Sequence, residues 1–130
     1  MGLYNFKARF VPYILAGGKT HTIRPIRANP DKPGNTLHLY TGLRQKGARL
    51  LMRVPCVKVE VLTIAVDGAM SIDGVHLSES EREAFARRDG FPNGWPEMFE
   101  FWTSIHRLPF EGHIVHWNPG LRKRRDVRGR

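Results

Sequence analysis

The sequence has little cysteine and no long apolar run, and both shortages narrow the possibilities. Cys56 is the only cysteine among 130 residues, so no disulfide can form within the chain and a reducing cytoplasm fits best. No stretch approaches the ~18 consecutive apolar residues of a membrane helix. The residues around Lys7 and Arg9 are not followed by an apolar segment, so we expect no signal peptide. Together these shortages predict a small cytoplasmic domain.

Acidic residues are scarce at both ends of the chain. Residues 1–58 contain 11 Lys and Arg against the single acid Asp31, residues 59–120 contain 4 against 10, and residues 121–130 contain 6 against Asp126. A basic surface attracts polyanions, because each neutralised phosphate releases condensed counterions. Nucleic acid or a nucleotide is therefore an expected partner, although a basic surface that serves only solubility has the same composition. We expect the segment 121–130 to be disordered, either as a nucleic-acid anchor or as a solvated end.

Several chemical motifs are also missing. The chain has no P-loop, no G-x-G-x-x-G and no G-x-S-x-G, so nucleotide hydrolysis, dinucleotide binding and serine hydrolysis lack support. A lone cysteine without a Cys/His cluster does not predict a zinc site. His113 and His116 are three residues apart on an expected strand, which places them on opposite faces. We therefore expect neither a metal nor an organic cofactor.

The hydrophobic pattern predicts many short strands and a few helices. Alternating or β-branched runs predict strands at 3–7, 20–24, 36–41, 49–65 and 113–117. In the run 49–65, Val57, Val59 and Val61 alternate with polar residues, and Pro55 suggests a bulge or an edge. Helical spacing predicts helices at 9–16, 79–88 and 96–106.

Helix signals and aromatic residues complete this prediction. Ser78 and Glu81 form a capping box at the start of the second helix. The apolar faces of the first and third helices are expected to bury Phe10, Ile14 and Leu15, and Met98, Trp102 and Ile105. All three tryptophans, Trp95, Trp102 and Trp117, are expected in the core. Short strands with two or three inserted helices indicate one α+β domain over residues 3–118, built as a small mixed β-barrel.

The most informative segment is Gly17-x-Lys19-x-x-Thr22-x-Arg24. It places a lysine at a turn between a helix and a strand, followed by a hydroxyl and a guanidinium that share one face of that strand. Arginine suits bidentate capture of a phosphate or a base edge, and a partly buried lysine can lose its proton near neutral pH. A strand with solvated basic residues has the same spacing, so the spacing alone leaves both interpretations open.

The order of segments resembles the ASCH superfamily. Residues 15–24 closely resemble its G-x-K-x-x-T-x-R signature, and residues 33–42 look like the turn and strand that follow it. Residues 86–91 and 98–102 are similar to the family's acidic-Gly-Phe stretch and next helix, and residues 114–117 to its last strand. In detail the chain looks most like short ASCH proteins of bacteria and their phages. The resemblance covers residues 3–118 and implies a PUA-like barrel whose cleft faces RNA or a modified nucleoside.

The resemblance also implies site residues. Some small bacterial members hydrolyse the acetyl amide of acetylcytidine with the signature lysine and threonine and a downstream glutamate, which fall on Lys19, Thr22 and Asp89 here. The acid is one methylene shorter in this chain, and an Asp-Gly pair also commonly ends a helix. The expected binding residues are Arg24, His21, Tyr40, Arg44 and Lys46. His21 either lines the cleft or faces solvent, and Tyr40 either stacks on a base or packs.

Two classes of function follow. The first is a metal-free hydrolase that acts on a modified pyrimidine nucleoside or on RNA. Another member of the superfamily is described as a ribonuclease. The second is a non-catalytic RNA-binding module that holds the backbone with its basic N-terminal half and its tail. The hydrolase requires that the side chains of Lys19, Thr22 and Asp89 lie close together, whereas the binding module does not.

Overall fold

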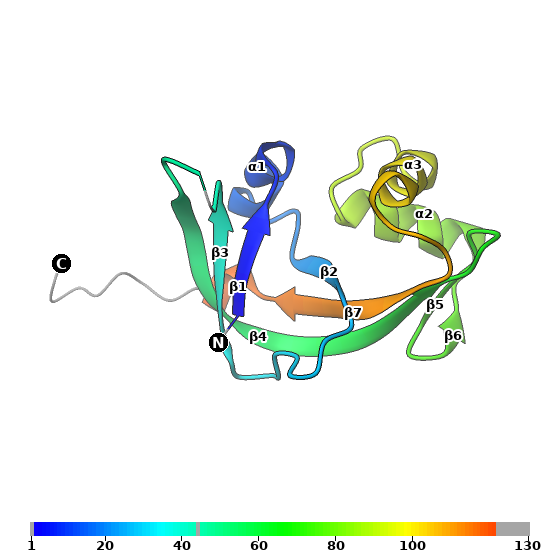
Figure 1. The fold of residues 1–130 in the computed structure, drawn as a ribbon, viewed down its shortest axis with the longest axis horizontal. Coiled ribbons are helices and arrows are strands. Elements are labelled where there is room, and N and C mark those ends of the chain that lie inside the picture. The colour runs from blue at the N-terminus through cyan, green and yellow to red at the C-terminus, as the bar shows by residue number, and fades with distance from the viewer. Residues whose placement is uncertain (1, 44, 122–130) are drawn as a thin grey trace, which may run out of the picture.

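A strongly curled mixed sheet of seven strands forms a half-barrel, and three short helices lie on one side of it (Figure 1). The structure is a computed structural model that describes residues 2–43 and 45–121. The α+β fold class is therefore confirmed. Along the chain the elements are β1 (Gly2–Phe6), the 3-10 helix η1 (Ala8–Phe10), α1 (Val11–Leu15), β2 (His21–Pro25), β3 (Thr36–Thr41), β4 (Arg49–Ile64), β5 (Met70–Ile72), β6 (Val75–His76), α2 (Glu79–Arg88), α3 (Trp95–Ile105), β7 (Phe110–Trp117) and the 3-10 helix η2 (Pro119–Leu121).

The long strand β4 connects the two halves of the sheet. Its first half pairs antiparallel with β3, and β1 extends that side as a parallel neighbour of β3. Its second half pairs antiparallel with β7, and β2 extends that side as an antiparallel neighbour of β7. The ladder with β7 has an irregularity between Cys56 and Lys58, directly after Pro55. Pro55 itself pairs in register with Thr36, so the irregularity lies just after the proline, where β4 changes partner.

The half-barrel has an open seam between β1 and β2. Within the described residues no ladder joins these two strands, since β1 pairs only with β3 and β2 only with β7. A side chain spans the seam: Arg24 Nη2 on β2 donates a hydrogen bond of 3.0 Å to the carbonyl oxygen of Asn5 on β1. Both terminal strands are built into the sheet as expected, but the sheet does not close into a complete barrel.

The core fills the hollow of the sheet and the underside of the helices. Leu37 and Leu39 of β3 are buried, as their alternation predicts. The buried hydrophobic residues are Tyr4, Phe6, Phe10, Ile14, Ile23, Leu37, Leu39, Met52, Val54, Cys56, Leu62, Ile64, Met70, Phe85, Ala86, Phe91, Met98, Trp102, Phe110, Ile114, Val115 and Trp117. No helix in the described part of the chain is long and apolar enough to cross a membrane.

Three expected core positions differ from the structure. Leu15 is exposed because it is the last residue of the five-residue helix α1, which buries Ile14 instead. Ile105 is also exposed, since it is the last residue of α3 and the chain turns away after it. Trp95, at the first turn of the same helix, is only partly buried, whereas Trp102 and Trp117 are buried as expected.

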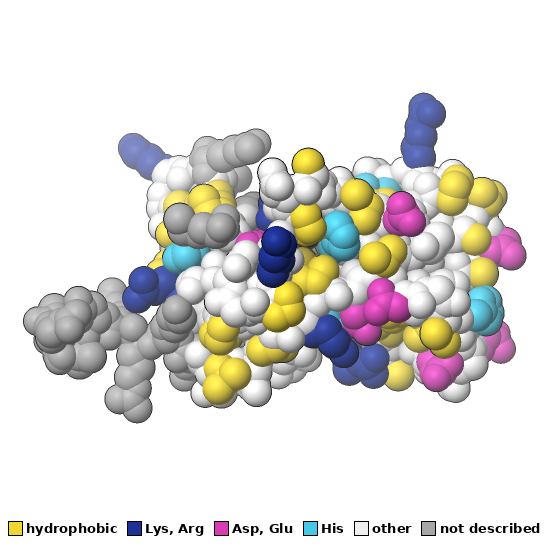
Figure 2. Space-filling model, turned by 90° about the horizontal axis from the view of Figure 1, so that it is seen from below, with side chains coloured by type: hydrophobic (Ala, Val, Ile, Leu, Met, Phe, Trp, Pro, Cys, Tyr) yellow, Lys and Arg dark blue, Asp and Glu magenta, His cyan; other side chains and the backbone are white. Residues whose placement is uncertain are grey.

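Charge is distributed unevenly on the face below the sheet. Acidic side chains lie mostly toward the end of the molecule that carries β5 and β6, and Lys and Arg mostly toward the middle and the opposite end (Figure 2). The charge asymmetry along the sequence is thus also an asymmetry in space. The basic segment expected at 121–130 lies, beyond Leu121, outside the described residues.

Candidate functional site

The signature segment runs from the end of α1 into β2. Gly17 has a positive φ of 85°, a conformation that glycine adopts without strain, so the chain turns sharply there. The carbonyl oxygen of Tyr13 then accepts hydrogen bonds from the backbone N–H groups of both Gly18 and Lys19, at 2.9 and 3.0 Å. This turn holds the Lys19 backbone against the end of α1 and directs its side chain toward the helices.

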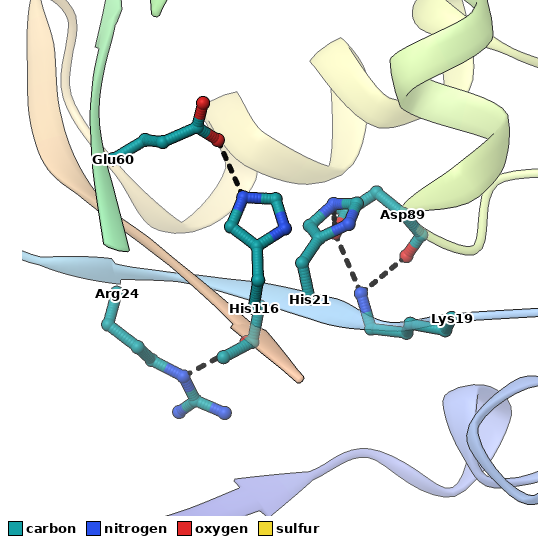
Figure 3. Close-up of polar contacts among 7 residues, drawn as sticks. Lys19, His21, Arg24, Glu60, Asp89 and His116 are labelled. Carbon is teal, nitrogen blue, oxygen red and sulfur yellow. Dashed lines mark hydrogen bonds and ion pairs between the residues drawn. The ribbon is translucent and has the colours of Figure 1, made fainter. Parts of the chain in front are cut away.

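Lys19 and Asp89 form a buried ion pair, although they are 70 residues apart in the sequence. Lys19 Nζ donates hydrogen bonds to Asp89 Oδ1 at 2.7 Å and to the Asp89 carbonyl oxygen at 2.6 Å (Figure 3). The two residues are only 3% and 5% exposed, so each charge is neutralised mainly by its partner. Two of the three residues expected to act together are therefore in direct contact.

Asp89 is held at the C-terminus of α2. Its backbone N–H donates to Phe85 O, and the next residue, Gly90, has a φ of 108°. A Cβ on Gly90 would lie 2.8 Å from the Phe10 ring and 3.7 Å from Lys19 Cδ. Glycine is thus required there by conformation and by space. The Asp-Gly pair both ends the helix and brings the carboxylate to Lys19, so its two expected roles coincide.

Burial and pairing act in opposite directions on the ion pair. Burial lowers the pKa of the Lys19 ammonium, because the charged form loses its hydration, and the neighbouring Asp89 carboxylate only partly offsets this. Burial by itself raises the pKa of Asp89, but Lys19 and His21 together lower it by more than burial raises it. The pKa of Asp89 therefore lies below its usual range. The carboxylate therefore stays ionised at neutral pH, while Lys19 loses a proton more easily than an exposed lysine does.

Thr22 and Arg24 are bonded to each other on the same face of β2. Arg24 Nε donates a hydrogen bond of 3.1 Å to Thr22 Oγ1. The Thr22 oxygen is therefore an acceptor in this contact, and its own proton is left for another partner. A guanidinium that donates to a hydroxyl oxygen stabilises the alkoxide that forms when the hydroxyl loses its proton. Lys19, Thr22, Arg24 and Asp89 all line one pocket.

That pocket has a volume of about 240 Å³, and residues of both β1 and β2, the strands that flank the seam, line it. Its walls are largely aromatic, and its polar groups come mainly from the signature segment and from Asp89. The aromatic rings are Phe6, Phe10, Phe91, Phe101, Trp102 and His106. Apolar walls with a few convergent polar groups are typical of small-molecule sites. Flat rings of this kind stack on planar heterocycles.

His21 lies behind this pocket, on the other face of β2. It is 3% exposed, and its ring stacks on Phe85 with the ring centroids 4.8 Å apart. Its Nε2 lies 2.9 Å from Asp89 Oδ1, although the ring is not aligned for a hydrogen bond in this conformation. His21 thus neither faces solvent nor lines the aromatic pocket: it contacts the ion pair from behind.

A second pocket, also of about 240 Å³, lies on that rear side between β2, β4, β7 and α2. It contains a pair that the sequence analysis did not identify: His116 Nε2 lies 2.6 Å from Glu60 Oε1. The His116 and His21 rings are neighbours, with centroids 5.6 Å apart. Burial lowers the pKa of His116, although Glu60 raises it in part. No sequence signal identifies this pair, because it depends on the register of β4 with β7.

The other expected binding residues are not brought to the aromatic pocket. The described residues that line it do not include Tyr40, which is half-buried on β3, or Lys46, which is exposed in the turn before β4. Arg44 lies outside the described residues. Within the described part of the chain, no three His, Cys, Asp or Glu side chains come together as a set of metal ligands. The candidate site therefore consists of Lys19, Thr22, Arg24 and Asp89 with its aromatic walls.

Comparison of the chain with protein-family models, with curated proteins and with solved structures finds no match.

Proposed function

We propose that the protein is an amidohydrolase that acts on an acylated pyrimidine nucleoside, with acetylcytidine as the first substrate to test. The observation that carries the proposal is the buried Lys19–Asp89 ion pair, which shares one aromatic pocket with Thr22 and Arg24. The resemblance of residues 15–24 to the ASCH signature points to the same residues. Hydrolysis of RNA is the other reaction that the resemblance implies.

The chemistry requires a base, a nucleophile and a donor for the oxyanion. Neutral Lys19 takes the proton from Thr22 Oγ1 or from a water, and the oxygen bonds to the acyl carbon. Collapse of the tetrahedral intermediate breaks the carbon–nitrogen bond, and the Lys19 ammonium returns its proton to the leaving nitrogen. When Thr22 is the nucleophile, a water activated by Lys19 then attacks the acyl ester, which releases the acid and restores the Thr22 hydroxyl. Arg24 is placed to stabilise negative charge, since it already donates to Thr22 Oγ1.

Asp89 has a positioning role in this scheme. It accepts two hydrogen bonds from Lys19 Nζ, one at Oδ1 and one at its carbonyl oxygen. A neutral lysine amine has two N–H groups and one lone pair, so an amine that keeps both bonds has its lone pair at the remaining tetrahedral position. Asp89 thus fixes the direction of the base, and its short side chain suffices because the end of α2 already reaches Lys19.

The test is hydrolysis of acetylcytidine by purified protein, followed by chromatography. We expect Lys19→Ala and Thr22→Val to lower kcat by about 100-fold or more, because each removes a group that acts in the transition state. Lys46→Ala is the matched control, since this lysine is exposed and distant in the fold, and its kcat should equal that of the wild type. Absence of turnover by the wild-type protein on acylated nucleosides and on RNA rejects the proposal.

The alternative is a non-catalytic RNA-binding module, which is favoured by the charge of the chain. Residues 1–58 have an excess of ten positive charges, and the net charge is +9. RNA titrations of the same variants separate the two functions. A binding module predicts that Lys19→Ala and Lys46→Ala both weaken RNA affinity and reduce its salt dependence, with no turnover in any variant.

A further inference from the structure

A substrate in the aromatic pocket would cover the ion pair of the candidate site on that side. Lys19 and Asp89 are 3% and 5% exposed, and both line the aromatic pocket that the proposed substrate fills. In the free protein Lys19 is paired as a cation with Asp89, so it must release one proton before it can act as the neutral base of the proposed reaction. While a substrate fills the pocket, that proton needs a route to water on another side of the pair.

A continuous series of titratable side chains leads away from the pair on the rear side of β2. Asp89 Oδ1 lies 2.9 Å from His21 Nε2, the His21 and His116 ring centroids are 5.6 Å apart, and His116 Nε2 lies 2.6 Å from Glu60 Oε1 (Figure 3). The two imidazoles line the rear pocket together with Glu60. This polar pocket is large enough to hold water between the rings.

We propose that His21 and His116, with Glu60 behind them, form a proton path that connects the Lys19–Asp89 pair to water through the rear pocket. The inference rests on the proposed function for its role in turnover, but the path itself is a property of the free protein. It assigns His21 as the link and the His116–Glu60 pair as the proton acceptor at the far end.

The transfers balance at each residue. A small rotation of the His21 ring aligns Nε2 with Asp89 Oδ1, which lies 2.9 Å away, and a proton can then pass from Lys19 through Asp89 to His21 Nε2. His21 releases the proton on its Nδ1 through water to His116 Nδ1. Glu60 can only accept a hydrogen bond, so it keeps the proton on His116 Nε2, and the imidazolium returns its Nδ1 proton to water. Recovery of the lysine proton reverses these steps, which restores the original His21 tautomer.

The charges around the path favour a neutral His116 that can accept a proton. The groups that face it are Glu60 and Lys58 from β4, His21 from β2 and Arg88 from α2. Lys58 Nζ lies 3.6 Å from Glu60 Oε2, so this lysine offsets part of the carboxylate charge. Burial and the neighbouring His21 and Lys58 lower the pKa of His116, while Glu60 stabilises the imidazolium during its short lifetime.

The first experiment needs no substrate. Exchange of the Lys19 ammonium hydrogens with water is measured by NMR on protein with isotope-labelled lysine. We expect His116→Ala to slow this exchange by about tenfold or more, and millimolar imidazole to restore it by occupying the enlarged rear pocket. His113→Ala is the matched control: it changes a histidine of the same strand that does not line the rear pocket, so exchange should stay at the wild-type rate.

A second variant guards against a folding defect. Glu60→Gln keeps His116 and the shape of the pocket but removes the carboxylate, and it should also slow the exchange. If both variants fold and exchange Lys19 hydrogens at the wild-type rate, the path is rejected. Restoration by imidazole supports it, because a purely structural role of His116 would not respond to a small base in solution.

Turnover then separates this inference from the proposed function. If acetylcytidine is hydrolysed, His116→Ala should lower kcat without changing KM, and imidazole should restore kcat. If His116→Ala slows the exchange but the wild-type protein hydrolyses no substrate, the proton path is supported and the proposed hydrolase activity is rejected. If the wild-type protein hydrolyses acetylcytidine and His116→Ala changes neither kcat nor the exchange rate, the hydrolase activity is supported and the proton path is rejected.

Discussion

Replacing Lys19 by methionine tests the energetics of the buried ion pair directly. The substitution keeps most of the apolar stem but leaves the Asp89 carboxylate, which is 5% exposed, without its cation. Breaking a buried pair by removing one partner costs about 3–5 kcal/mol, because the remaining charge is buried and uncompensated. For a small domain with an m-value of about 2 kcal/mol per molar urea, this lowers the urea midpoint by about 2 M.

The same variant should reverse the pH dependence of stability. In the wild type the pKa of Asp89 is lowered, so its contribution is present above its unfolded value of about 3.9 and is lost as the pH falls through the folded value. Without Lys19 the principal lowering influence is gone and burial raises the pKa of Asp89. The contribution is then present at low pH and lost as the pH rises, so Lys19→Met should gain stability between pH 7 and pH 4.

Urea unfolding at several pH values measures both effects, with Lys46→Met as a control that should stay within about 0.5 kcal/mol of the wild type. The double variant Lys19→Met/Asp89→Asn removes both charges and should be more stable than Lys19→Met alone. A midpoint for Lys19→Met equal to that of Lys46→Met would refute a buried ion pair. The buried ion pair would also be refuted if Lys19→Met lost stability on acidification in parallel with the wild type.

Three further outcomes are expected. Gly90→Ala should destabilise the protein by about 1–3 kcal/mol, because the φ of 108° is strained for alanine and the added Cβ would lie 2.8 Å from Phe10. Thermal unfolding measures this effect, and an unchanged midpoint would contradict the described conformation of Gly90. Ser78→Ala should cost about 1 kcal/mol by removing the hydroxyl that accepts from Glu81 N. Ser80→Ala, two residues along, removes only the hydroxyl–hydroxyl contact with Ser78, leaves the cap in place and serves as the comparison. Deletion of residues 121–130 should leave the unfolding midpoint unchanged and make the salt dependence of RNA binding shallower, whereas an equal slope would assign the segment to solubility alone.

Local signals in the sequence predicted the elements well. The capping box at Ser78 gave the start of α2, and the structure has both of its hydrogen bonds. Alternation gave β3 with the correct buried face. Alternation did not tell which face of β4 is buried: Val57 and Val61 alternate with polar residues, yet both are exposed. The periodicity of a strand gives its two faces, and only the tertiary packing decides which of them meets the core.

The candidate site was predictable only where a motif carried it. The Lys19, Thr22 and Arg24 positions came from one continuous segment, and Asp89 came from a resemblance. The Glu60–His116 pair was missed, because it depends on an antiparallel register in which Glu60 lies opposite Ile114 and Lys58 opposite His116. Composition carries no information on such a register. His21 was left open between cleft and solvent, since a strand position alone does not reveal the helix end that covers it.

The open seam has a consequence for how fast the aromatic pocket can admit a ligand. A ladder between β1 and β2 would have to lose several backbone hydrogen bonds, each worth about 1 kcal/mol, before its strands could separate. Across the seam, the Arg24 side chain spans the gap to the Asn5 carbonyl oxygen. Side-chain rotamers change in about picoseconds to nanoseconds, far faster than local unfolding. A rotamer change of Arg24 can therefore widen the gap between β1 and β2 beside the pocket at the cost of a few side-chain contacts, while every strand keeps its partners.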